Sequence, residues 1–281
     1  MNVQKKFALA YLRTKLNLLS VISKRSAGNE AFRLFCTPLH RYNGKEADIF
    51  KKAEKLEFES GDVTIRGYRC NAPQSKKVLL LHGFSSTCHK FDKYAIALVN
   101  QGYEVLAFDA PAHGASSGNT VNAVEYCDMI KKVYDNYGPI DAYIAHSFGG
   151  IAVSLALEEL PHTSNTKLVL IAPATETTSA IEGAFTMLGI ANKKVRQAMD
   201  DIIFSISGKQ TEWFSVRRAM QNIRASVLWI HDEEDEITPL ADALKVKEAS
   251  PKHIRFLITK GLGHQKIYRD AKVKNEILSF L

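Results

Sequence analysis

Residues 140–160 read IDAYIAHSFGGIAVSLALEEL, and this stretch decides the fold. Residues 140–145 form a short apolar run that is typical of a buried parallel strand, and residues 151–160 have the pattern of a helix that ends at Pro161. Ser147 stands between them, in a turn that pushes a hydroxyl out above the edge of a sheet. Such a turn needs small residues two positions before and after the serine, because the strand and helix backbones approach closely.

Ala145 and Gly149 occupy these two positions. An alanine adds only a methyl group, so it remains compatible with the turn. The same residues have a second interpretation, in which Ser147 is an ordinary helix N-cap, a frequent role of serine. The rest of the chain must decide between the two.

Strand and helix patterns alternate from residue 55 to the end of the chain. The turn Ser60-Gly61-Asp62 predicts an antiparallel hairpin between residues 55–59 and 63–69. Further strands are predicted at 78–81, 104–108, 140–145, 167–171, 227–230 and 254–258, and helices at 89–100, 123–137, 151–160, 240–249 and 270–281. This alternation predicts an α/β domain, with a mostly parallel sheet and helices on both faces.

Residues 174–224 interrupt the alternation, because they contain no strand pattern. Helical patterns cover residues 180–188, 194–205 and 212–222 instead. A helical insertion of this kind is typical of a lid over a site. The predicted organisation is therefore an N-terminal helical extension over 1–54, a core in two parts over 55–173 and 225–281, and a small helical cap or lid over 174–224.

A nucleophilic serine needs a base, and His264 is the candidate. It follows the last predicted strand in the sequence Gly261-Leu262-Gly263-His264, where flanking glycines let a loop swing the ring over the sheet edge. A surface-loop histidine is the alternative for any one of the nine histidines. His146 adjoins the serine, so we expect its ring to point elsewhere. In the loops of His82 and His113 we expect the backbone to matter more than the ring.

The base in turn needs an acid that holds its tautomer. Residues 231–239, HDEEDEITP, follow strand 227–230 and offer five carboxylates. Asp235 is the best placed, four residues before Pro239, which suits the first turn of the next helix. Most of the five carboxylates are expected to be solvated.

A tetrahedral intermediate carries a negative charge that backbone N–H groups stabilise. The N–H of Phe148 directly follows the serine and is one candidate donor. The loop His82-Gly83-Phe84-Ser85 follows strand 78–81 and supplies the other, the N–H of Phe84.

Along the chain these motifs follow one another in the order oxyanion loop, serine, acid and histidine. In this order the chain resembles the α/β-hydrolase-fold serine hydrolases, from about residue 55 to residue 281. The segment Asp109-Ala110-Pro111-Ala112-His113-Gly114 adds a further match, close to the D-x-P-G-H-G turn of that family. Ala145 and Ala112 stand where the family usually has glycine. The resemblance implies a triad of Ser147, Asp235 and His264 that works without a cofactor.

Serine at position 147 favours ester, thioester or related acyl chemistry, through an acyl-enzyme. Two alternatives stay open: an acyltransferase with the same triad, and a non-catalytic binding protein on the same fold. The predicted lid is rich in apolar side chains, which indicates a small-molecule substrate with an apolar acyl group, unless these side chains only pack the lid helices. The candidate substrate residues are Phe185, Met187, Trp213 and Phe214.

The net charge of +7 is unevenly distributed. Residues 1–77 have a surplus of +9, and the remainder has a net charge of −2, which argues against a nucleic-acid-binding protein. The four cysteines are scattered, and the histidines and acids show no metal-ligand spacing such as HExxH, so we predict no metal site. Sparse single cysteines fit a reducing compartment, so we expect a cytoplasmic protein.

Residues 1–26 predict a helix with six basic side chains and no acid. One apolar face contains Val3, Phe7, Tyr11, Leu18, Val21 and Ile22, and a second set, Leu9, Leu12, Leu16 and Leu19, widens it. Such a helix either packs on the protein or makes weak contact with a membrane surface, which would place the protein peripherally. We favour packing, because the apolar face is broader than a surface-lying helix needs.

Overall fold

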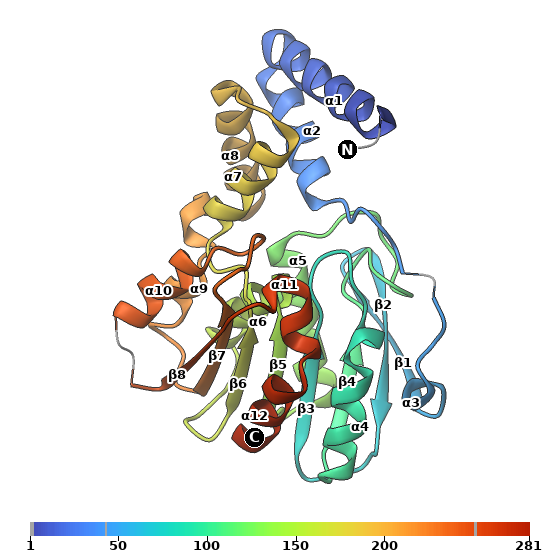
Figure 1. Cartoon of the computed structure of the whole chain (residues 1–281). Coiled ribbons are helices and arrows are strands. Elements are labelled where there is room, and N and C mark those ends of the chain that lie inside the picture. The colour runs from blue at the N-terminus through green and yellow to red at the C-terminus, as the bar shows by residue number, and fades with distance from the viewer. Residues whose placement is uncertain (1–2, 43, 250–251) are drawn as a thin grey trace. The chain divides into compact units, whose positions relative to one another are not determined.

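The computed structural model describes residues 3–42, 44–249 and 252–281. Within these residues eight strands form one sheet, in the order β1-β2-β4-β3-β5-β6-β7-β8 (Figure 1). The β1–β2 and β2–β4 pairs are antiparallel, and all other pairs are parallel. The strands are β1 Glu54–Ser60, β2 Val63–Cys70, β3 Lys77–Leu81, β4 Glu104–Phe108, β5 Ala142–His146, β6 Lys167–Ile171, β7 Ser226–Asp232 and β8 Ile254–Thr259. The predicted α/β fold and the predicted hairpin are confirmed.

The helices mostly follow the predicted segments. They are α1 Val3–Ile22, α2 Lys24–Cys36, α3 Asp48–Lys51, α4 Asp92–Asn100, α5 Ala123–Tyr137, α6 Phe148–Leu157, α7 Thr177–Leu188, α8 Lys193–Ser207, α9 Val216–Ala219, α10 Leu240–Glu248, α11 Gly263–Lys266 and α12 Ala271–Phe280. Short 3-10 turns occupy Cys88–Phe91, Thr211–Trp213 and Ile267–Arg269.

Two predicted helices were wrong in their extent. The helix predicted over 212–222 is divided into a 3-10 turn and α9, because Ser215 caps α9 by accepting the N–H of Arg218. The helix predicted over 1–26 ends at Ile22, because Ser23 caps α2 and accepts the N–H of Ser26. In both cases a serine cap starts a new helix, whereas the apolar periodicity alone predicts one continuous helix.

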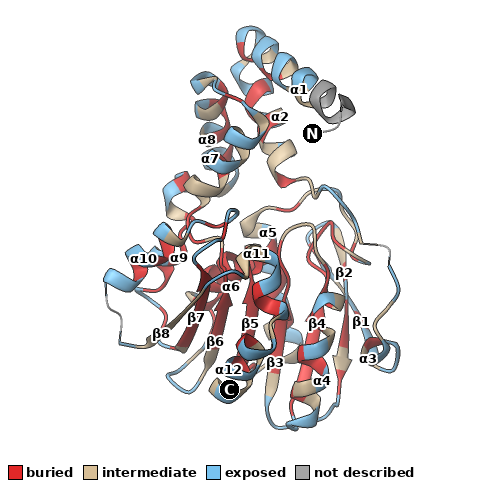
Figure 2. Cartoon of the chain, in the orientation of Figure 1, coloured by how far each residue is buried: buried red, intermediate tan, exposed pale blue. Residues whose placement is uncertain are grey.

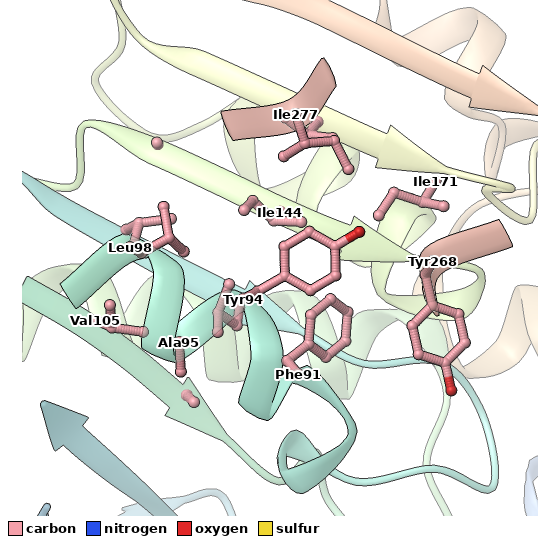
Figure 3. Close-up of a cluster of buried hydrophobic side chains, with 14 of the residues drawn as sticks. Phe91, Tyr94, Ala95, Leu98, Val105, Ile144, Ile171, Tyr268 and Ile277 are labelled. Carbon is pink, nitrogen blue, oxygen red and sulfur yellow. The ribbon is translucent and has the colours of Figure 1, made fainter. Parts of the chain in front are cut away.

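Both faces of the central strands β4 and β5 are buried, since successive side chains of a strand point to opposite sides and all of those in β4 and β5 are covered. Val78 and Leu80 of β3 face a cluster that also contains side chains of α4 and α12. Figure 3 shows Phe91 and Tyr268 side by side in this cluster, next to Tyr94, and the rings of Phe91 and Tyr268 stack at a centroid distance of 5.8 Å. Helices α5 and α6, which pack on each other, lie on the opposite face (Figure 1).

The described chain divides into two compact units. The core unit comprises Pro38–Thr175 and Ser215–Leu281 and holds the whole sheet. The helical unit comprises Met1–Thr37 and Glu176–Phe214, so two segments far apart in sequence build one body. The predicted functional roles of residues 1–54 as an extension and 174–224 as a lid stay predictions.

The helical unit is held together by the packing of α2 against α8. Ala27, Gly28 and Ala31 are the buried small residues of α2 that allow this approach. A Cβ on Gly28 would overlap the backbone carbonyl of Ala198 in α8, so the two helices meet at van der Waals distance. Helix α1 joins them through Leu16, which is fully buried, and through Asn17, whose side chain accepts a hydrogen bond of 3.0 Å from Asn192.

The substitution Gly28→Ala should lower the free energy of unfolding by about 1–3 kcal/mol, because the new methyl group forces α2 away from α8. The matched control is Gly183→Ala in α7, where an added Cβ has no neighbour within 4 Å. That change should raise helix stability by up to about 1 kcal/mol. Thermal unfolding followed by circular dichroism measures both. Equal shifts for the two variants would show that α2 and α8 are not in close contact.

Candidate active site

Ser147 occupies a strained turn between β5 and α6. Its backbone dihedral angles are φ 53° and ψ −117°, a conformation that a residue with a side chain adopts only when the surrounding fold imposes it. A Cβ on Gly149 would lie 2.8 Å from the carbonyl oxygens of both Leu81 and His82, so a larger residue does not fit there. Ala145 is fully buried in β5, which shows that its methyl group is accommodated.

Three side chains from separate loops form a hydrogen-bonded row in the core unit. The distance between Ser147 Oγ and His264 Nε2 is 3.0 Å, and the distance between His264 Nδ1 and Asp235 Oδ2 is 2.8 Å. Ser147 follows β5, Asp235 follows β7 and His264 follows β8, so the parallel sheet brings all three to one edge. Their arrangement can transfer a proton from the serine hydroxyl to the imidazole and hold the resulting charge beside a carboxylate.

Asp235 is held ionised by its hydrogen bonds. Burial alone would raise the pKa of this carboxyl, but the hydrogen bond and charge of His264 and the backbone N–H groups of Thr238 and Ile237 lower the pKa to about 2. Oδ1 accepts both N–H groups, at 2.8 Å from Ile237 and 2.9 Å from Thr238. The carboxylate therefore has a fixed orientation toward the imidazole.

Thr238 is a further site residue, and sequence reasoning missed it. Its hydroxyl donates to Asp235 Oδ2 at 2.8 Å and lies 3.2 Å from His264 Nδ1. The segment Asp235-Glu236-Ile237-Thr238 places an acceptor three residues before a hydroxyl, as in a side-chain-capped turn. That spacing was the available signal.

Phe84 and Phe148, the predicted oxyanion donors, belong to the two segments that adjoin Ser147. The two aromatic rings meet edge to face at 5.6 Å, and a Cβ on Gly83 would lie 2.9 Å from Ser147 Cβ. Among the described residues neither N–H has a hydrogen-bond partner. Two free donors beside a nucleophile could bind an oxyanion.

Two buried histidines fix the loop that carries Phe84. His113 Nε2 accepts the N–H of Ser85 at 2.8 Å, and His82 Nε2 accepts the N–H of Ala110 at 2.9 Å. Each ring donates its Nδ1–H to a nearby carbonyl, that of Pro111 or that of Gly83. Each ring thus joins two loop segments through its two nitrogens, and the expectation that the backbone of these loops matters more than the rings stays a prediction.

The four predicted substrate residues all belong to the helical unit. Phe214 is buried and its ring packs against that of Trp213 at 5.2 Å, whereas Met187 is exposed and Phe185 is half-buried. Their role in substrate binding stays a prediction. Within the described residues no group of three or more His, Cys, Asp or Glu side chains is arranged to hold a metal ion.

The sheet order, the strained serine turn and the three loops that meet above it define the class of protein: the chain has the α/β-hydrolase fold. Comparison with known proteins gives the same class. Residues 72–211 match the model of a family described as serine aminopeptidase, S33. The resemblance inferred from the sequence motifs is thus confirmed.

Solved structures with the same fold include several hydrolases. An esterase from Pyrococcus furiosus is 19% identical, with 88% of this chain and 97% of that chain covered and a TM-score of 0.66. The thioesterase domain from the curacin biosynthetic pathway is 16% identical, with 81% of this chain and 97% of that chain covered and a TM-score of 0.58. A serine hydrolase from Cycloclasticus zankles is 17% identical, with 81% and 97% covered and a TM-score of 0.58. No curated protein sequence gives a significant match.

The stability of the fold should fall as the pH is lowered from 7.5 to 5. Burial, followed by a neighbouring histidine, lowers the pKa of both His113 and His146 to about 3. Between an unfolded pKa near 6.5 and this value, the unfolded chain binds protons that the folded chain does not. Each histidine therefore removes up to about 1.4 kcal/mol of stability for each pH unit below 6.5.

The melting temperature, measured across this pH range, tests the expectation. His113→Asn keeps a donor and an acceptor and should flatten the dependence, whereas His40→Gln changes an exposed histidine and should leave it unchanged. A wild-type melting temperature that rises toward pH 5 would contradict the assignment of neutral buried rings.

Proposed function

We propose that this protein is a serine hydrolase that cleaves a carboxylic ester or thioester through an acyl-enzyme on Ser147. The observation that carries the proposal is the unbroken hydrogen-bonded row from Ser147 through His264 to Asp235. A serine that only capped a helix would not need a histidine at 3.0 Å, and the side chain of Ser147 makes no capping hydrogen bond to α6. The three groups therefore act as a catalytic triad in this proposal.

In the acylation step Ser147 Oγ attacks the substrate carbonyl carbon while its proton passes to His264 Nε2. The N–H groups of Phe84 and Phe148 bind the carbonyl oxygen as it becomes negative. Asp235 stabilises the imidazolium and keeps the remaining proton on Nδ1. When the tetrahedral intermediate collapses, His264 gives the Nε2 proton to the leaving alcohol or thiol.

In the deacylation step His264 takes a proton from water, and the resulting hydroxide attacks the acyl carbon. The second intermediate expels Ser147 Oγ, which regains its proton from Nε2. An acyltransferase would use the same groups with an alcohol or amine in place of water, so added acceptors would divert the product in that case. A binding protein on this fold would show no turnover at all.

An apolar acyl group is the proposed substrate feature. It rests on the apolar side chains of the helical unit, among them Phe185, Met187 and Trp213. Cys70, Cys88 and Cys127 are buried thiols. Sparse, unpaired thiols of this kind suit a reducing compartment, which supports the proposed cytoplasmic location. None of the helices in the described part of the chain is both long and apolar enough to cross a bilayer.

Ser147→Ala should abolish both turnover and labelling by a fluorophosphonate probe, and His264→Ala should lower kcat by about three orders of magnitude or more. A panel of p-nitrophenyl esters and acyl-CoA thioesters of increasing chain length measures turnover and acyl preference. Ser154→Ala is the control, because Ser154 is buried in α6, the helix that follows Ser147, and its hydroxyl donates a hydrogen bond to the carbonyl of Gly150. Labelling that persists in Ser147→Ala would refute the proposed nucleophile.

A second proposal concerns weak membrane contact by α1. The structure supports packing, since Leu16 is buried, but Tyr11, Leu18, Val21 and Ile22 are exposed. Much of α1 is exposed in Figure 2. The side chains of Val3 and Phe7 lie outside the described residues. The helical unit has about a quarter of the residues, yet it contains seven of the eleven exposed large apolar side chains that the structure describes. Lys24 and Arg25 are exposed beside this face and would favour an anionic surface.

The double variant Val21→Ser/Ile22→Ser should weaken co-sedimentation with vesicles that contain phosphatidylserine, because these side chains are 84% and 80% exposed. Binding of the unchanged protein should also fall as salt is added. Leu39→Ser alters an equally exposed side chain of the core unit and should have no effect. Absence of binding by the unchanged protein at low salt would refute membrane contact and leave packing as the role of α1.

A further inference from the structure

Asp232 is a second buried carboxylate near the candidate site, and the proposed mechanism does not use it. It is the last residue of β7, and its side chain accepts four hydrogen bonds. Oδ1 accepts the N–H of Glu234 at 3.0 Å and that of Gly263 at 2.9 Å. Oδ2 accepts the N–H of Leu262 at 3.1 Å and the hydroxyl of Thr259 at 2.7 Å. Asp232 is fully buried, unlike the solvated carboxylates that the sequence predicts for most of this loop.

These bonds join the loop that carries Asp235 (residues 233–239, the acid loop) to the loop that carries His264 (residues 260–264, the histidine loop). Glu234 belongs to the loop that carries Asp235, while Leu262 and Gly263 directly precede His264. The loop of residues 260–264 is open to solvent at Gly261, where a Cβ would meet no atom within 4 Å, although Leu262 packs against the core. Gly261 and Gly263 also adopt φ values of 82° and 56°. A glycine-rich loop with these properties needs an external anchor to hold one conformation.

The charge of Asp232 suits this task. Burial would raise its pKa, but the hydrogen bonds from Thr259 and from the backbone N–H groups of Gly263, Glu234 and Leu262 outweigh burial and lower it. A carboxylate makes stronger hydrogen bonds to N–H groups than a neutral acceptor does. Asp232 is thus ionised, and its hydrogen bonds hold the backbone on the N-terminal side of His264 in place.

A second hydrogen bond holds the backbone of His264 itself. His146 Nε2 donates a hydrogen bond of 3.0 Å to the backbone carbonyl of His264, and the two rings lie 4.8 Å apart. The ring of Tyr268 covers the imidazole of His146 at 4.5 Å. Since His146 directly precedes Ser147, this bond ties the histidine loop to the serine turn. The backbone of residues 262–264 is therefore fixed from both β7 and β5.

We propose that Asp232 is a positioning residue for His264: it fixes the backbone of Leu262 and Gly263 so that the imidazole reaches both Asp235 and Ser147. The inference rests on the proposed hydrolase function. It requires no contact of Asp232 with substrate. A misplacement of a catalytic group by about 1 Å costs on the order of 10²-fold in rate, which sets the expected size of the effect.

The test is Asp232→Asn in the full-length protein, with kinetics on the best ester of the panel. We expect kcat to fall about 10²-fold while KM changes less than about twofold, because the loop loses an N–H acceptor but the substrate site is untouched. The rate of fluorophosphonate labelling should fall in parallel. The NMR signal of the His264 Nδ1 proton bonded to Asp235 should weaken or shift. Glu236→Gln, an exposed carboxylate of the same loop, is the control and should match the unchanged protein.

Several outcomes would overturn the inference. An Asp232→Asn variant with unchanged kcat and labelling rate would show that the conformation of the histidine loop does not depend on Asp232. If Asp232→Asn abolished turnover while Asp235→Asn kept full turnover, Asp232 would be the triad acid instead. If Asp232→Asn does not fold, Thr259→Val removes one of the four bonds and should give a smaller fall in kcat, and an unchanged kcat would count against the proposal. Absence of Ser147-dependent turnover in the unchanged protein would refute the proposed function itself.

Discussion

The close approach of helix α6 to the end of strand β3 is the constraint on which the candidate site depends. The carbonyl oxygens of Leu81 and His82 lie so near the start of α6 that only glycine fits at position 149. This contact accompanies the strained, positive-φ turn at Ser147, and the loop of Gly83 and Phe84 lies beside that turn. One steric condition thereby places the serine next to the two segments whose N–H groups are the proposed oxyanion donors.

Buried polar side chains then fix the loops that the sheet brings to this edge. His82 and His113 hold the loop after β3, and Asp232 and His146 hold the loop before His264. Each of these groups makes at least one hydrogen bond to a different loop, and such bonds offset the energetic cost of burying it. The loops at this edge are thereby tied to one another.

The sequence predicted the core unit more fully than the helical unit, for physical reasons. Strands such as β4 and β6 are apolar runs bounded by turn residues, so local composition identifies them. The places of Ser147, Asp235 and His264 followed from the loops after β5, β7 and β8, and the structure brings the three side chains together, although their catalytic role stays a proposal. Thr238 and Asp232 were not recognised, because their roles depend on hydrogen bonds to backbone atoms that no periodicity encodes. The pairing of α2 with α8 was also not predicted, because it joins segments far apart in the chain.

The assembly of the helical unit from two distant segments has a consequence for synthesis on the ribosome. Gly28 emerges about 170 residues before its partner Ala198, and at roughly 5–20 residues per second the delay is on the order of ten seconds or more. During that time Gly28 has no α8 to pack against, so the pairing of α2 with α8 cannot form. The helical unit therefore completes its fold only after translation has passed α8.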